Sequence, residues 1–220
     1  MKFIGIFLAI LLLGAAVAWY SMQSLPSWFK EQASNEQQAV DALSQKISEQ
    51  GVDAFLGDKI VDLVRGQIVF NETEFNALLL ASLKLNADGQ QLLQVSDGIH
   101  ASLNKDEVEI ATVINLDKVE QINPQAREAV ESFDKFFFFL DGSRLAVSVY
   151  GTPVVRNGRL AIKDDFHIKV GAIPISNSTL KQLGVEVERA NESELALRLL
   201  TLSSVTLEEG KISFAAQPRF

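Results

Sequence analysis

The stretch that decides the fold is residues 70–85, FNETEFNALLLASLKL. Asn71, followed three residues later by Glu74, matches a capping box, in which each side chain binds the other residue's backbone amide at the start of a helix. The apolar positions behind this cap recur at helical spacing, and they are Phe75, Leu78, Leu79 and Leu83. This pattern predicts a helix over residues 72–85 with an apolar face that must be covered by other elements.

Alternating apolar and polar residues on both sides of this helix predict antiparallel strands. The predicted strands are residues 67–70, 93–103, 108–116, 145–149, 160–170, 201–207 and 211–215. Asn157-Gly158 is typical of a two-residue hairpin turn. Further helices are predicted from Pro124 onward and at residues 177–183. Because hairpins with one apolar face must bury it, we expect an α+β fold: an antiparallel curved sheet of hairpins packed on one or more helices.

An apolar segment precedes this domain. Residues 3–20, FIGIFLAILLLGAAVAWY, carry no charge, and no charged residue follows before Lys30. A helix of this length spans about 27 Å, close to the hydrocarbon thickness of a bilayer. Trp19, Tyr20 and Trp28 suit the far interface, and Lys2 places the N-terminus in the cytoplasm. We therefore expect an N-terminal transmembrane helix with the bulk of the chain extracytoplasmic, in the periplasm of a bacterial envelope.

A cleaved signal peptide is the alternative interpretation of residues 1–20. Ala16-Val17-Ala18 fits the small-residue cleavage pattern, and cleavage after Ala18 would give a secreted protein. Residues 21–66 are predicted to form a linker and a helical stem, with helical patterns at residues 31–50 and 52–65. The first of these is a stalk, a coiled-coil seam or a half-exposed packing helix. Residues 67–220 form the predicted extracytoplasmic α+β domain.

The composition excludes several classes of function. The 220 residues include 20 Lys and Arg against 28 Asp and Glu, a net charge of −8 that argues against nucleic-acid binding. The absence of cysteine excludes disulfides, thiolate metal sites and a cysteine nucleophile. None of the GxSxG, P-loop, GxGxxG or HExxH motifs occurs. His167 beside Asp165 is interpreted as part of a solvent-facing strand. We expect no enzyme activity, no metal and no cofactor.

Four short segments together resemble a known group of proteins. They are residues 25–29 (LPSWF), 70–79 (FNETEFNALL), 151–160 (GTPVVRNGRL) and 170–175 (VGAIPI). With the N-terminal membrane segment, they resemble the YpmS-like bacterial membrane-anchored proteins, which are similar to the tubular lipid-binding (TULIP) superfamily. The resemblance covers roughly residues 67–215. It implies a curved sheet wrapped on a long helix, in some members with a groove for acyl chains, and it implies no catalytic motif.

The most unusual string is residues 133–140, FDKFFFFL. It either packs in the core, lines a cavity for a ligand, or forms an exposed membrane or protein contact. An acyl chain has no polar handle, so a lipid site needs only a concave apolar lining and leaves no motif. The candidate lining residues for such a ligand are Phe75, Leu79, Phe133, Phe137, Phe139, Leu160, Ile162, Phe166 and Ile168.

The sequence therefore predicts a membrane-tethered, non-catalytic extracytoplasmic domain that binds a lipid-like or apolar ligand. An envelope scaffold or interaction protein, with a protein partner and no small-molecule ligand, is the alternative. These two hypotheses differ in whether the apolar faces of the strands close on one another or leave room between them.

Overall fold

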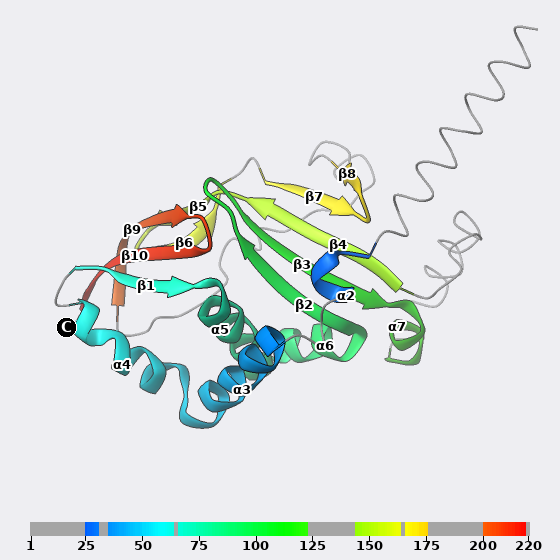
Figure 1. Ribbon diagram of the computed structural model, residues 1–220, viewed down its shortest axis with the longest axis horizontal. Coiled ribbons are helices and arrows are strands. Elements are labelled where there is room, and N and C mark those ends of the chain that lie inside the picture. The colour runs from blue at the N-terminus through cyan, green and yellow to red at the C-terminus, as the bar shows by residue number, and fades with distance from the viewer. Residues whose placement is uncertain are drawn as a thin grey trace, which may run out of the picture.

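The computed structural model describes residues 25–30, 35–63, 66–122, 144–163, 166–175 and 200–218. These residues form an α+β fold with antiparallel sheets and several helices (Figure 1). The predicted span at residues 3–20 lies outside these ranges, as do residues 133–140 and the helices predicted from Pro124 and at residues 177–183. Among the helices within them, none is both long enough and apolar enough to cross a membrane.

Helix α5 (Glu72–Leu85) begins at the capping box that the sequence predicts. The Asn71 Oδ1 atom accepts a hydrogen bond from the backbone N–H of Glu74 at 2.9 Å, and Glu74 Oε2 accepts one from the N–H of Asn71 at 3.1 Å. Lys59 Nζ lies 2.6 Å from the other carboxylate oxygen of Glu74. The predicted helix over residues 72–85 is confirmed, and both bonds hold its first turn.

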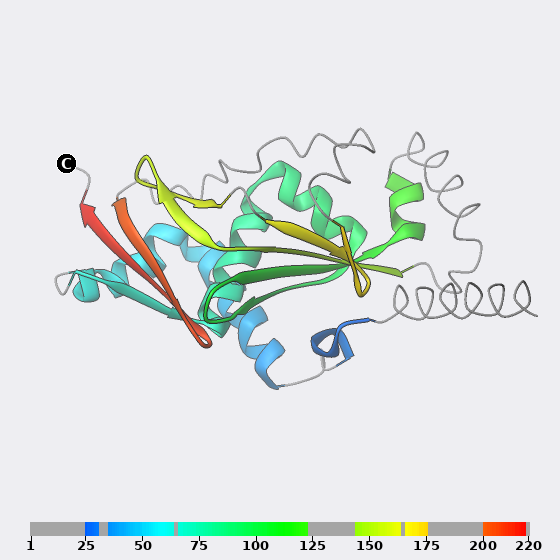
Figure 2. The same cartoon turned by 90° about the horizontal axis from the view of Figure 1, so that it is seen from above.

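The described strands form three antiparallel sheets. One has the strand order β1 (Ile68–Asn71), β10 (Lys211–Pro218) and β9 (Leu200–Glu208). The largest has the order β2 (Ser96–Leu103), β3 (Val108–Asn115), β4 (Arg144–Gly151), β7 (His167–Val170) and β8 (Ile173–Ile175). The third is the hairpin of β5 (Pro153–Arg156) and β6 (Arg159–Ile162). Figure 2 shows how strongly these sheets twist relative to one another.

Five further helices complete the described chain. They are α2 (Ser27–Lys30), α3 (Asn35–Gln50), α4 (Val52–Leu63), α6 (Ala87–Val95) and α7 (Leu116–Ile122). Helices α3 and α5 pack together, so the stretch that the sequence left open as a stalk or a packing helix packs on the domain. The main core joins Ile47 of α3, Leu56 of α4 and Phe75 of α5 with Ile68 and Ile212 of the smaller sheet.

The free edge of β2 is closed by α5. The Asn76 side chain, 2% exposed, accepts a hydrogen bond from the N–H of Ala101 at 2.6 Å and donates one to its carbonyl at 2.7 Å. One turn earlier, Glu72 Oε2 accepts from the N–H of Leu103 at 2.9 Å, while the Leu103 carbonyl accepts from the N–H of Gly210 at 2.8 Å. The backbone groups of Ala101 and Leu103 at the β2 edge are thus paired. The Leu103–Gly210 bond also joins the five-stranded sheet to the three-stranded one.

Two strand predictions differ from the structure. Residues 93–95 belong to helix α6, so the strand predicted at residues 93–103 begins only at Ser96. Gly89 of α6 packs closely on the last turn of α5: a Cβ there would lie 2.4 Å from the Leu83 carbonyl oxygen. The strand predicted at residues 160–170 is divided: β6 ends at Ile162 and pairs with β5, whereas β7 begins at His167 and pairs with β4.

The Asn157-Gly158 turn and the closing hairpin are confirmed. Asn157 and Gly158 have φ angles of 53° and 75°, the left-handed values that this turn requires. The tip is fixed by a hydrogen bond of 3.1 Å from the N–H of Leu202 to the Gly158 carbonyl. This contact places the β5–β6 hairpin against β9, beside the main core.

Candidate functional site

One face of the five-stranded sheet is apolar from edge to edge. Strand register puts Ala101, Ile110, Val149, Ile168 and Ile175 in one row across β2, β3, β4, β7 and β8. The neighbouring row contains Ile99, Thr112, Val147, Val170 and Ile173. In the described strands, neither row holds a charged side chain, so this surface can only make apolar contacts and a single hydroxyl contact.

The coverage of these rows changes along the sheet. On β2, Ala101 is fully buried under α5, and Ile99 packs with Leu80 of α5 and with leucines of α6. On β4, β7 and β8 the same rows are only half-buried, and this part is called the apolar face: Val147, Val149, Ile168, Val170, Ile173 and Ile175. The α5 and α6 helices lie toward the β2 edge, away from β7 and β8 (Figure 1).

Gly151 at the end of β4 seats two more apolar side chains on this surface. A Cβ at Gly151 would lie 2.3 Å from Ile162 Cγ2 and 3.2 Å from Phe166 Cβ, so both residues pack directly on the glycine. Both are half-buried. They extend the apolar face toward the β5–β6 hairpin.

The predicted lining residues fall into three groups. Ile162, Phe166 and Ile168 lie together on or beside the apolar face. Phe75, Leu79 and Leu160 belong to the main core or pack against it. Phe133, Phe137 and Phe139 lie outside the described residues.

Sequence reasoning omitted the β8 part of this surface and did not join it to β4. Ile173 and Ile175 were not predicted to lie in a strand, because Gly171 and Pro174 are residues that usually end one. The alternation of Val147 and Val149 was visible, and so was that of Ile168 and Val170. What the sequence could not show is that β7 pairs with β4 rather than continuing β6.

The opposite face of the same sheet, called the polar face, carries polar and charged side chains among fully buried small residues such as Ala111, Ala146 and Ser148. Glu109, Tyr150 and His167 are direct neighbours across β3, β4 and β7. The Tyr150 hydroxyl donates to Glu109 Oε1, the His167 ring stacks on the Tyr150 ring with centroids 5.0 Å apart, and Lys169 Nζ lies 3.9 Å from the Tyr150 centroid. Burial raises the pKa of Tyr150, the hydrogen bond to the Glu109 carboxylate raises it further, and Lys169 opposes both. Tyr150 therefore remains a neutral donor.

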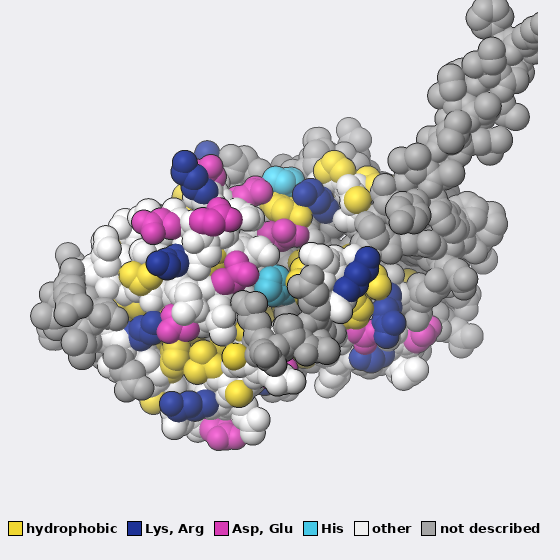
Figure 3. Space-filling view, viewed as in Figure 1, with side chains coloured by type: hydrophobic (Ala, Val, Ile, Leu, Met, Phe, Trp, Pro, Cys, Tyr) yellow, Lys and Arg dark blue, Asp and Glu magenta, His cyan; other side chains and the backbone are white. Residues whose placement is uncertain are grey.

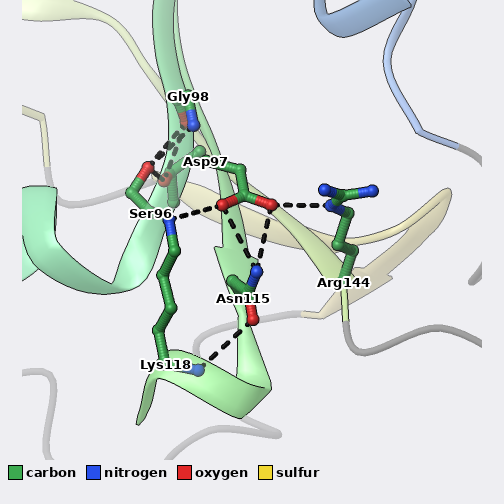
Figure 4. Close-up of polar contacts among 7 residues, drawn as sticks. Ser96, Asp97, Gly98, Asn115, Lys118 and Arg144 are labelled. Atoms are coloured by element: carbon green, nitrogen blue, oxygen red, sulfur yellow. Dashed lines mark hydrogen bonds and ion pairs between the residues drawn. The ribbon is translucent and has the colours of Figure 1, made fainter. Parts of the chain in front are cut away.

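A second polar cluster lies at the far end of the sheet, beside α7 (Figure 4). The Asp97 carboxylate accepts hydrogen bonds from Lys118 Nζ at 2.7 Å, from Arg144 Nε at 2.6 Å and from the Asn115 amide at 3.2 Å. Burial raises the pKa of Asp97, but these hydrogen bonds outweigh it and bring the pKa down from 3.8 to about 2. Asp97 is thus ionised at any physiological pH and holds both cations in place.

Helix α2 lies on the polar face of the sheet, opposite α5 and α6 (Figure 2). The Trp28 ring stacks on His100 of β2, with centroids 5.3 Å apart and an interplanar angle of 21°. The Phe29 ring lies edge-on to Trp28 and 5.9 Å from the Arg144 guanidinium carbon. Glu72 Oε1 lies 3.7 Å from His100 Nε2, so the same histidine links α2 to the first turn of α5.

The two faces therefore offer different chemistry. The charged and polar groups on the polar face pair with one another, and this is the arrangement of a structural network. The apolar face offers adjacent aliphatic and aromatic side chains that are only partly buried. It is the part of the described chain best suited to an apolar ligand. No protein-family model, curated protein or solved structure matches this chain.

Proposed function

We propose that this protein is a membrane-tethered extracytoplasmic domain that binds a lipid-like ligand on its apolar face and performs no catalysis. The observation that carries the proposal is the continuous half-buried row on β4, β7 and β8, extended by Ile162 and Phe166. Aliphatic side chains arranged in this way favour a hydrocarbon chain, because each buried methylene contributes about 0.8 kcal/mol. Contiguous apolar side chains that stay partly exposed mark an interaction site more often than a surface that only faces water.

The resemblance to YpmS-like proteins and the TULIP superfamily supports the same proposal, since it implies a curved sheet wrapped on a helix and, in some members, an acyl-chain groove. The apolar segment at residues 3–20 supports a position on the outer side of the cytoplasmic membrane. A ligand taken from that membrane would have a short path to the domain.

Photolabelling in a membrane tests the proposal. The full chain is reconstituted into phosphatidylcholine vesicles that contain a phospholipid with a diazirine on its acyl chain, and labelled peptides are identified by mass spectrometry. We expect labels on β4, β7 and β8 in addition to any on residues 3–20. Labels confined to the apolar N-terminal segment would refute a ligand site on the sheet and favour the scaffold alternative.

A pair of tryptophan variants sharpens this test. Ile173→Trp adds bulk on the apolar face, at an edge strand that tolerates it, and we expect it to reduce labelling of β4 and β7. Ala172→Trp adds the same bulk one residue away, at an exposed position in the turn, and we expect no change. Equal loss in both variants would mean that the label reports general unfolding.

A further inference from the structure

Helix α2 fixes the direction from which the chain enters the domain. It is the first described element, and its Trp28 and Phe29 rings contact His100 and Arg144 on the polar face of the sheet. These contacts anchor α2 to both β2 and the first residue of β4. The chain therefore reaches the domain at the end where β4 begins and α7 lies (Figure 1).

The length of chain before α2 limits how far this end can lie from the membrane. The predicted span ends at Tyr20, and only residues 21–24 separate it from Leu25. A fully extended chain covers at most about 3.5 Å per residue, so Leu25 lies within about 17 Å of the bilayer interface. This limit rests on the membrane tether of the proposed function.

The charges at this end suit a membrane surface. The Lys118 and Arg144 side chains are 41% and 52% exposed, whereas the Asp97 carboxylate between them is only 12% exposed. Lys30 at the end of α2 is also exposed. Among the described side chains at this end, Asp117 is the exposed acidic one. The cations thus point outward and their counterion lies beneath them.

This end differs from the rest of the molecule. Although the whole chain has a net charge of −8, several Lys and Arg side chains lie beside acidic ones near α2 and α7 in Figure 3, while acidic side chains predominate over the middle of the same face. Anionic lipids give a membrane surface a negative potential, which attracts exposed cations near the bilayer. The acidic middle of the domain is repelled by the same phosphates.

We infer that the α2–α7 end of the domain docks on the surface of the membrane that anchors the chain, with Lys30, Lys118 and Arg144 against the phosphates of anionic lipids. The domain then stands on this end rather than swinging freely on its tether. The apolar face begins on the same sheet, so docking holds one end of it close to the lipid.

Energy transfer from single labels tests this orientation. The chain has no cysteine, so Asp117→Cys on α7 and Gln67→Cys before β1 each give one site for a fluorophore, near to and far from the proposed contact. Full-length protein is reconstituted into vesicles of phosphatidylcholine, with or without phosphatidylglycerol, that carry a headgroup acceptor dye. We expect severalfold greater transfer from position 117 than from position 67, and a larger difference with phosphatidylglycerol. Equal transfer from both positions would overturn the orientation, and a difference insensitive to phosphatidylglycerol would overturn the phosphate contact.

Matched charge variants separate the contact from the tether alone. The double variant Lys30→Gln with Lys118→Gln should abolish the phosphatidylglycerol effect, while Lys105→Gln with Lys211→Gln, two exposed lysines away from this end, should keep it. Loss of the effect in both pairs would refute the contact, because the dependence on phosphatidylglycerol would then reflect only the net charge of the protein. Flotation with the vesicles is measured first: protein that does not float refutes the tether of the proposed function, whereas floating protein without a preferred orientation refutes only this inference.

Discussion

The two edges of the five-stranded sheet are built differently. At β2, α5 closes the edge with the buried Asn76 amide and the Glu72 carboxylate, and the apolar side chains beneath are fully buried. At β7 and β8, the same apolar rows continue but remain half-buried. From this difference we expect the helix-covered edge to contribute most of the stability, whereas the proposed ligand surface lies at the other edge.

The strongest test of this comparison is Asn76→Ala. The substitution leaves the N–H and the carbonyl of Ala101 buried without their partners, so we expect the free energy of unfolding to fall by about 3 kcal/mol. Urea denaturation of the full chain in detergent measures it. Gln91→Ala, which removes an exposed amide on α6, should change the free energy by less than about 0.5 kcal/mol. Similar small effects in both variants would show that the β2 edge is not the stable part.

Gly151→Ala tests the half-buried part of the sheet, next to the apolar face. Its Cβ would lie 2.3 Å from Ile162 Cγ2, so Ile162 and Phe166 must move, and we expect a loss of about 2 kcal/mol from overpacking. The shift also disturbs the apolar face, so acyl-chain labelling of β7 should fall. Gly57→Ala in α4 is the matched control: nothing lies within 4 Å of its Cβ, and removing a helical glycine should stabilise the fold by roughly 0.5–1 kcal/mol. A Gly151→Ala protein with unchanged stability and labelling contradicts the packing described for this glycine.

The smallest effect concerns Asp97 and pH. Its pKa in the folded state is about 2, below the ordinary 3.8, so the carboxylate stabilises the fold above pH 3.8 and this contribution is lost as the pH falls from 3.8 toward 2. Because Lys118 and Arg144 are partly exposed to solvent, we expect only about 1 kcal/mol. Denaturation of wild type and Asp97→Asn over this pH range measures it. The difference between the two proteins should shrink in acid, and a constant difference would mean that Asp97 acts by packing alone.

The candidate site was only partly predictable. Ile162, Phe166 and Ile168 could be found from alternation, because a half-buried strand shows its apolar face in the sequence. Ile173 and Ile175 could not, since Gly171 and Pro174 interrupt a three-residue strand that is stable only by pairing with β7. Phe75 and Leu79 resemble lining residues in the sequence, yet in the structure Phe75 lies in the main core and Leu79 packs against it.

The sequence by itself determined the elements whose signals are local. The capping box of α5, the left-handed turn at Asn157-Gly158 and the closing hairpin each depend on residues that are near neighbours in the chain. Tertiary structure alone decided that β7 pairs with β4, that residues 93–95 are helical and that Asn76 closes the edge of β2. These features depend on contacts between residues far apart in the chain, and the free energy of such contacts appears only when the whole domain has packed.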